Sequence, residues 1–105
     1  MDRKGVYSAL KECGLPCAYM GWNSDSVPEL PYVVFLQGGS NDFIADNERY
    51  AQRKDWVIEL YQEVPNAGVE QLLEEVLESL GIFTSGANVW VNENSSIMTP
   101  YYITI

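Results

Sequence analysis

Histidine is missing from this 105-residue sequence, and basic side chains are few. The absence of histidine removes the usual general base near neutral pH and the commonest metal ligand. It excludes most hydrolase triads and most zinc sites. We therefore expect no catalytic residue, no cofactor and no metal site, and a function in binding or assembly rather than an enzyme activity.

Positive charge is scarce and is confined to one half of the chain. Six basic residues stand against 15 acidic ones, for a net charge of −9, which disfavours duplex DNA and anionic membranes as partners. Residues 1–54 hold all six basic and seven acidic residues, whereas residues 55–105 hold eight acidic residues and no basic one. One interpretation is a solvated acidic face on a helix. The other is a polar molecule whose basic edge meets the acidic surface of a neighbour, as in a head-to-tail ring.

Long hydrophobic runs are also missing. The longest one, Tyr32 to Leu36, is too short to span a bilayer, and the first ten residues lack the apolar segment of a signal peptide. These absences predict a cytoplasmic protein, or one assembled in the cytoplasm into something larger, with no membrane partner. Cysteine is limited to Cys13 and Cys17, which we expect to be reduced and at least half-buried.

The composition, with 47% hydrophobic residues, predicts one globular domain over residues 1–105. Apolar periodicity predicts two helices, at 2–13 and 66–81, and strands at 31–37, 52–63, 89–91 and 101–105, and residues 16–21 are expected to be extended. Residues 43–50 fit either a short edge strand or a mobile loop. The order α-β-β-β-α-β-β predicts an α+β fold: a mixed, mostly antiparallel sheet with two helices packed on one face.

The second predicted helix has the strongest apolar periodicity in the chain. We expect its stripe to face the sheet and to pack on Trp56, Ile58, Leu60, Ile103 and Ile105. The stripe comprises Val69, Leu72, Leu73, Val76, Leu77 and Leu80.

Two short motifs have a structural rather than a functional interpretation. The glycine-rich segment 38–41 lacks the Gly-Lys-Ser/Thr ending of a phosphate loop and is expected to be a hairpin turn. Asp42, Asp46 and Glu48 do not have the spacing of an EF-hand and are expected to be solvated.

A candidate protein interface combines aromatic and basic side chains. Aromatic residues make up 12% of the chain, and they are enriched at interface centres, although a small sheet also fills its core with them. Five aromatic residues lie outside the expected core: Trp22, Phe43, Tyr50, Tyr61 and Tyr102. The predicted interface consists of Phe43, Arg49, Tyr50, Arg53 and Lys54.

Two alternatives apply to the basic part of this interface. Arg53 shares a strand face with Asp55 and Glu59, so it could be neutralised within its own sheet. Lys54 begins the core-facing row and is expected to extend its ammonium group to the sheet edge.

Several segments together resemble a known family. Residues 14–19 (Gly-Leu-Pro-Cys-Ala-Tyr) follow a short helix, and Pro-Glu-Leu-Pro-Tyr-Val-Val follows at 28–34. Residues 41–47, 58–61 and 77–82 continue the pattern over nearly the whole chain. In order and spacing these segments resemble small head–tail joining or tail-completion proteins, similar to tail terminators, of long-tailed phages and prophages.

The resemblance implies a mixed sheet with two helices on one side and a homo-oligomeric ring, commonly of six subunits. Such a ring caps the tail tube and docks it to the head connector, and its subunits can stay monomeric until they meet the tail. The implied partners are tail-tube and head-connector proteins, and the implied locations are the host cytoplasm during assembly and then the virion head–tail junction. No specific nucleic acid is expected, because an acidic bore does not hold DNA. The alternative function is a free-standing acidic adaptor or inhibitor domain that binds a basic cellular protein.

Overall fold

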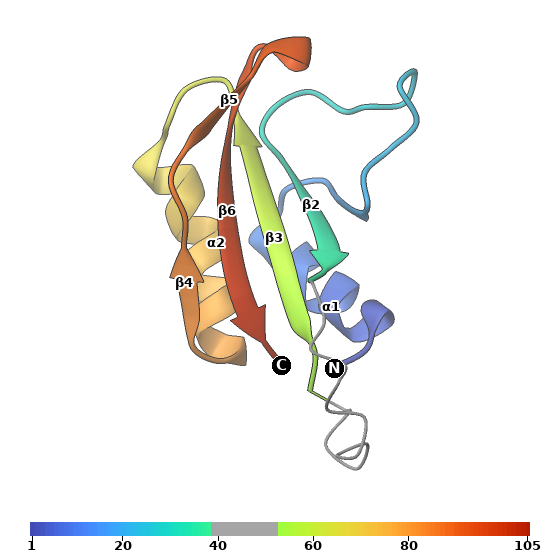
Figure 1. Ribbon diagram of the computed structural model, residues 1–105, viewed down its shortest axis with the longest axis vertical. Coiled ribbons are helices and arrows are strands. Elements are labelled where there is room, and N and C mark those ends of the chain that lie inside the picture. The colour runs from blue at the N-terminus through green and yellow to red at the C-terminus, as the bar shows by residue number, and fades with distance from the viewer. Residues whose placement is uncertain (39–52) are drawn as a thin grey trace.

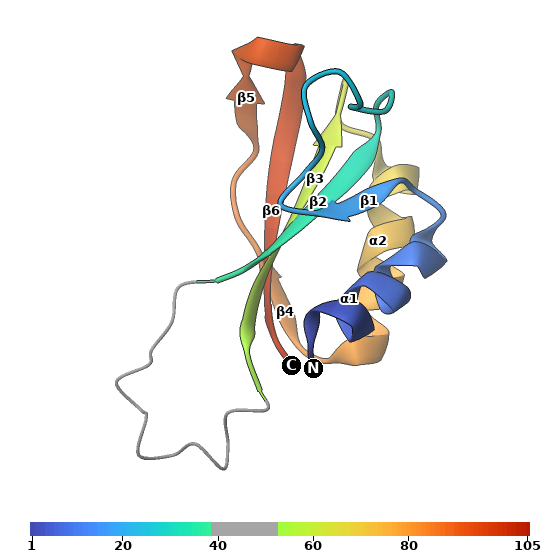
Figure 2. The same ribbon diagram turned by 90° about the vertical axis from the view of Figure 1, so that its right-hand side faces the viewer.

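The computed structural model describes residues 1–38 and 53–105. Both helices lie on one face of a six-stranded sheet, as Figures 1 and 2 show. In chain order the elements are α1 (Arg3–Leu10), β1 (Cys17–Tyr19), β2 (Tyr32–Gln37), β3 (Asp55–Gln62), α2 (Ala67–Leu80), β4 (Phe83–Ser85), β5 (Val89–Val91) and β6 (Ser96–Thr104). Single 3-10 turns follow α1 and β5.

The sheet has the strand order β1-β2-β3-β6-β4, and β5 pairs with β6 beyond the end of β4. Strand β1 is parallel to β2, and every other pair is antiparallel. This arrangement confirms the predicted α+β class, with its mostly antiparallel sheet and both helices on one face.

Two strands differ from the sequence prediction. Strand β4 was not expected, because its Phe-Thr-Ser segment holds one apolar residue and no alternation. Strand β6 begins at Ser96 rather than at residue 101, and it runs through Pro100. The backbone carbonyl of Pro100 accepts from Gly86, so its ring nitrogen faces the break between β4 and β5. Proline is tolerated there because its missing N–H group removes few hydrogen bonds from the sheet.

Capping residues define the helix ends, which agree closely with the predicted ranges. The side chain of Asn66 accepts hydrogen bonds from the backbone N–H groups of Gly68 and Val69, so it is the N-cap of α2. After α1 and its 3-10 turn, Gly14 adopts the left-handed conformation, with φ of 83°. Asp2 caps α1 by accepting from Gly5 at 2.8 Å.

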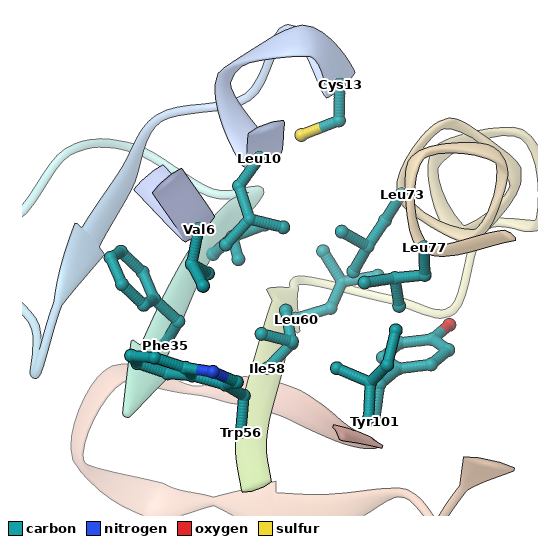
Figure 3. Packing of buried hydrophobic residues seen from close by; sticks show 12 residues of the cluster. Val6, Leu10, Cys13, Phe35, Trp56, Ile58, Leu60, Leu73, Leu77 and Tyr101 are labelled. Carbon is teal, nitrogen blue, oxygen red and sulfur yellow. The ribbon is translucent and has the colours of Figure 1, made fainter. Parts of the chain in front are cut away.

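The core lies between the two helices and the sheet (Figure 3). Strand β3 alternates strictly, so Trp56, Ile58 and Leu60 face the helices and are buried, as predicted. Packed against them are Val6 and Leu10 from α1, Leu73 and Leu77 from α2, and Phe35, Tyr101 and Ile103 from the neighbouring strands.

The apolar stripe predicted for α2 includes one residue that does not face the sheet. Leu73 and Leu77 are fully buried, and Val69, Val76 and Leu80 are half-buried. Leu72 is 45% exposed, so its predicted contact with the sheet is wrong. One residue advances 100° around a helix, which places Leu72 on the flank when Leu73 points at the sheet.

Candidate protein interface

Of the five predicted interface residues, the structure describes Arg53 and Lys54. Phe43, Arg49 and Tyr50 lie outside the described residues. Arg53 and Lys54 directly precede β3, at the end of the sheet where the amino and carboxyl termini of the chain also lie (Figure 1).

Backbone hydrogen bonds fix this end of the sheet. The N–H of Lys54 donates to the carbonyl of Ile105, and the N–H of Ile105 donates to the carbonyl of Lys54, both at 2.9 Å. The amino-terminal ammonium group of Met1 donates to the Ile105 carbonyl at 3.0 Å. We call these residues, together with Arg53 and Thr104, the terminal end. Its cationic groups are therefore carried by an ordered ladder.

The side chains of Arg53 and Thr104 make hydrogen bonds at the terminal end. Arg53 is exposed, and its Nη2 donates to the Thr104 carbonyl at 3.4 Å. The hydroxyl of Thr104 donates to Oδ1 of Asp55 at 2.6 Å. On the same face, Glu59 accepts from the Tyr61 hydroxyl at 3.0 Å. The Arg53 guanidinium therefore has a local backbone acceptor and still faces solvent.

A depression opens at the terminal end, with both polar and apolar walls. Arg53, Asp55 and Thr104 line one part, and Val57, Ile82 and Tyr102 line another. The Ile82 side chain is 91% exposed, and Tyr102 is also exposed, as the sequence predicted for Tyr102. The chain thus presents apolar side chains beside its cationic groups, which is the composition of many protein interfaces.

The other described aromatic residues of the prediction belong to the sheet. Tyr61 stacks on Tyr32 with ring centroids 5.1 Å apart, and Trp22 meets Tyr32 edge-on at 5.1 Å. Burial, followed by the hydrogen bond to Glu59, raises the pKa of the Tyr61 phenol. Trp22 and Tyr61 therefore pack on the outer face of β2 and β3 and do not extend the candidate interface.

The acidic face predicted for α2 is divided between sheet and solvent. Glu74 accepts from the Tyr101 hydroxyl at 2.8 Å, and Glu70 accepts from Nε2 of Gln62 at 3.1 Å. Burial and the bond to Glu74 raise the pKa of Tyr101. Glu75 and Glu78 are exposed. The sequence carries no signal for the first two contacts, because they join residues of different elements.

The thiols have the predicted placement. Cys13 is buried, Cys17 is half-buried, and both are free. Desolvation raises the pKa of each thiol, so both are protonated near neutral pH.

Residues 1–38 and 53–105 form no cluster of three or more cysteine, aspartate or glutamate side chains that could hold a metal ion. In the same part of the chain, no helix is both long and apolar enough to cross a membrane.

No protein-family model, no curated protein and no solved structure matches this chain. The resemblance to head–tail joining proteins therefore stays a prediction.

Proposed function

We propose that this chain is a structural subunit of the head–tail junction of a long-tailed phage or prophage, where it joins or completes the tail as part of a ring. The proposal rests on the composition of the terminal end. Arg53, Lys54 and the Met1 ammonium lie there, the exposed Ile82 lines the same depression as Met1 and Arg53, and no residue after Lys54 is basic.

The terminal end fits a partner surface that is acidic around an apolar centre. Cations of this kind steer a carboxylate-rich partner during encounter, and burial of Ile82 and Tyr102 would then hold it. The ladder between Lys54 and Ile105 holds the backbone that carries the cationic side chains before binding, so less backbone entropy is lost on docking.

A ring subunit needs two different surfaces that fit each other in neighbouring copies. All six basic side chains lie in residues 1–54, whereas residues 55–105 hold eight acidic side chains and no basic one, which supports such a pair of surfaces. The α+β fold also agrees with the architecture that the resemblance implies. The proposal assigns no catalytic role, since the two thiols are protonated near neutral pH and the chain has no histidine to activate a nucleophile.

The runner-up, an acidic adaptor that binds a basic cellular protein, rests on the glutamates of α2. Two of these four side chains turn toward the sheet, which leaves Glu75 and Glu78 as the exposed pair. The neighbouring genes distinguish the two functions. A position between capsid and tail-tube genes supports the joining function, and a position among host regulatory genes supports the adaptor.

The variant Arg53→Glu/Lys54→Glu tests the role of the terminal end. It should slow the joining of heads and tails from the phage that encodes the chain, and the effect should be larger at low than at high salt. Electron micrographs of mixed heads, tails and purified protein give the fraction of joined particles over time.

The matched comparison is between the single variants Lys54→Glu and Lys4→Glu, which make the same charge change directly before β3 and on the exposed part of α1. The fold should survive in each, because exposed ion pairs contribute only about 0–1 kcal/mol. Joining at the wild-type rate with the doubly reversed variant would refute the role assigned to Arg53 and Lys54.

A further inference from the structure

The sheet ends in an open strand edge on each side. Strand β1 is the last strand on one side and β4 on the other, and no described residue adds a strand beyond either. The two edges lie at the same level along the strand direction, because one row of paired residues crosses the sheet from β1 to β4. This row consists of Tyr19, Phe35, Ile58, Tyr101 and Ser85.

The backbone at both edges points outward at this level. On β1, the N–H of Met20 donates to the Phe35 carbonyl, so the polar groups of the preceding Tyr19 point away from β2. On the other side, the N–H of Gly86 donates to the Pro100 carbonyl, so the polar groups of Ser85 point away from β6. The pairings make β1 antiparallel to β4 when the sheet is continued from one copy into the next.

A row of basic side chains accompanies the β1 edge. Arg3, Tyr7 and Lys11 recur every four residues and therefore share one side of α1 and its 3-10 turn. The guanidinium carbon of Arg3 lies 4.0 Å from the ring centroid of Tyr19 in β1, and Nζ of Lys11 lies 5.5 Å from that of Tyr7. We call Arg3 and Lys11 the basic row.

A row of acidic side chains accompanies the β4 edge with the same spacing. Glu70, Glu74 and Glu78 recur every four residues on α2, and the bond from Tyr101 to Glu74 places this row on the β6–β4 side of the helix. We call these three residues the acidic row. At 1.5 Å per residue, each row spans about 12 Å.

We infer that copies of this chain associate edge to edge, with β1 of one copy beside β4 of the next and the basic row facing the acidic row. In Figure 2, α1 rises from the amino terminus and α2 descends toward the same end, so Arg3 of one copy is level with the exposed Glu78 of the next, while Glu70 keeps its hydrogen bond to Gln62. This inference rests on the proposed function and names the contact between neighbours in the ring. The same contact repeats in every copy, as closure of a ring requires.

Each side of the sheet also carries an exposed apolar side chain, and the two lie five rows apart in the strand pairing, so they do not face each other in this contact. Met20, at the end of β1, is 66% exposed, and Trp90, on β5 just beyond β4, is 57% exposed. An open edge with such residues invites strand pairing, and the short length of β1 and β4 limits the contact to one partner of matching charge.

A charge swap tests the facing rows. Sedimentation equilibrium of the purified chain from micromolar concentration to about 1 mM should show reversible association for the wild type. Arg3→Glu or Glu78→Arg alone should raise the dissociation constant about tenfold, and the two together should restore it to within about threefold. Glu75→Arg is the control, because it makes the same change on a side of α2 that points away from β4.

A proline tests the strand edge independently of charge. Ser85→Pro removes an outward N–H and leaves the bonds between β4 and β6 in place, so it should abolish association, whereas Ser85→Ala should not. Circular dichroism and thermal unfolding of both variants show whether the subunit itself stays folded. If the proline variant unfolds, the charge-swap experiment alone tests the edge-to-edge contact.

Three results would overturn the inference: a wild-type chain that is monomeric throughout, a double variant no tighter than the single ones, or association unchanged in a folded Ser85→Pro variant. Each of these leaves the joining function testable through Arg53 and Lys54. Conversely, edge-to-edge association in a chain that never joins heads to tails would refute the joining function alone.

Discussion

Replacement of Leu73 by alanine is the sharpest test of how the helices hold the sheet. Leu73 projects from α2 into the space between the helices and β3, and its exposed fraction is 0% (Figure 3). Alanine in its place removes buried carbon atoms and leaves a cavity between elements that cannot fully close. Such a loss costs about 2–5 kcal/mol in free energy of unfolding.

The neighbouring Leu72 provides a control with identical chemistry. It is 45% exposed, so Leu72→Ala removes only part of its contact and opens no enclosed cavity, for a cost of less than about 1 kcal/mol. Both changes replace leucine by alanine inside the same helix, so the small difference in helix propensity cancels in the comparison.

Urea denaturation followed by tryptophan fluorescence gives both free energies of unfolding. The slope with denaturant should be the same for the wild type and both variants, since the surface exposed on unfolding hardly changes. Equal losses for Leu72→Ala and Leu73→Ala, or a loss below about 0.5 kcal/mol for Leu73→Ala, would refute this packing of α2 on the sheet.

Two further predictions follow from the titrating groups. Because desolvation raises the pKa of both thiols, Cys13 and Cys17 should react with iodoacetamide more slowly than free cysteine at pH 7, and unfolding in urea should restore the ordinary rate; equal rates in both states would contradict their burial. Burial raises the phenol pKa of Tyr61 and Tyr101, so above about pH 10 the folded chain holds protons that the unfolded chain releases, and the free energy of unfolding should fall as the pH rises. Urea titrations at pH 8 and pH 11 measure this fall, and Tyr61→Phe/Tyr101→Phe should reduce it.

The elements that the sequence predicted well are those in which local pattern and tertiary packing agree. In strand β3, the large apolar residues Trp56, Ile58 and Leu60 alternate with less buried ones, and all three lie in the core as this alternation predicts. The cap at Asn66 and the left-handed Gly14 depend on neighbours within three residues, so they too are visible in the sequence.

The features that the sequence did not predict depend on contacts between distant segments. Strand β4 exists because Phe83 pairs with Ile103, and no local alternation indicates this pairing. The apolar periodicity of α2 includes Leu72. Leu72 is exposed because the contact between helix and sheet is narrower than the apolar stripe.

For the candidate interface, the sequence predicted the clustering of Arg53 and Lys54 but not their surroundings. The register between β3 and β6 brings Ile105 opposite Lys54, and α1 brings Met1 to the same place. The three positive groups of the terminal end therefore gather through pairings over roughly half the chain or more, which a charge pattern along the sequence does not contain.

The location of the chain in a virion tests the proposed function most directly. Gold-labelled antibody against the purified chain, applied to particles of the phage or induced prophage that encodes it, should mark the junction between head and tail. Tailed particles that carry no label there, while the antibody still detects the chain free in the lysate, would contradict the proposed function.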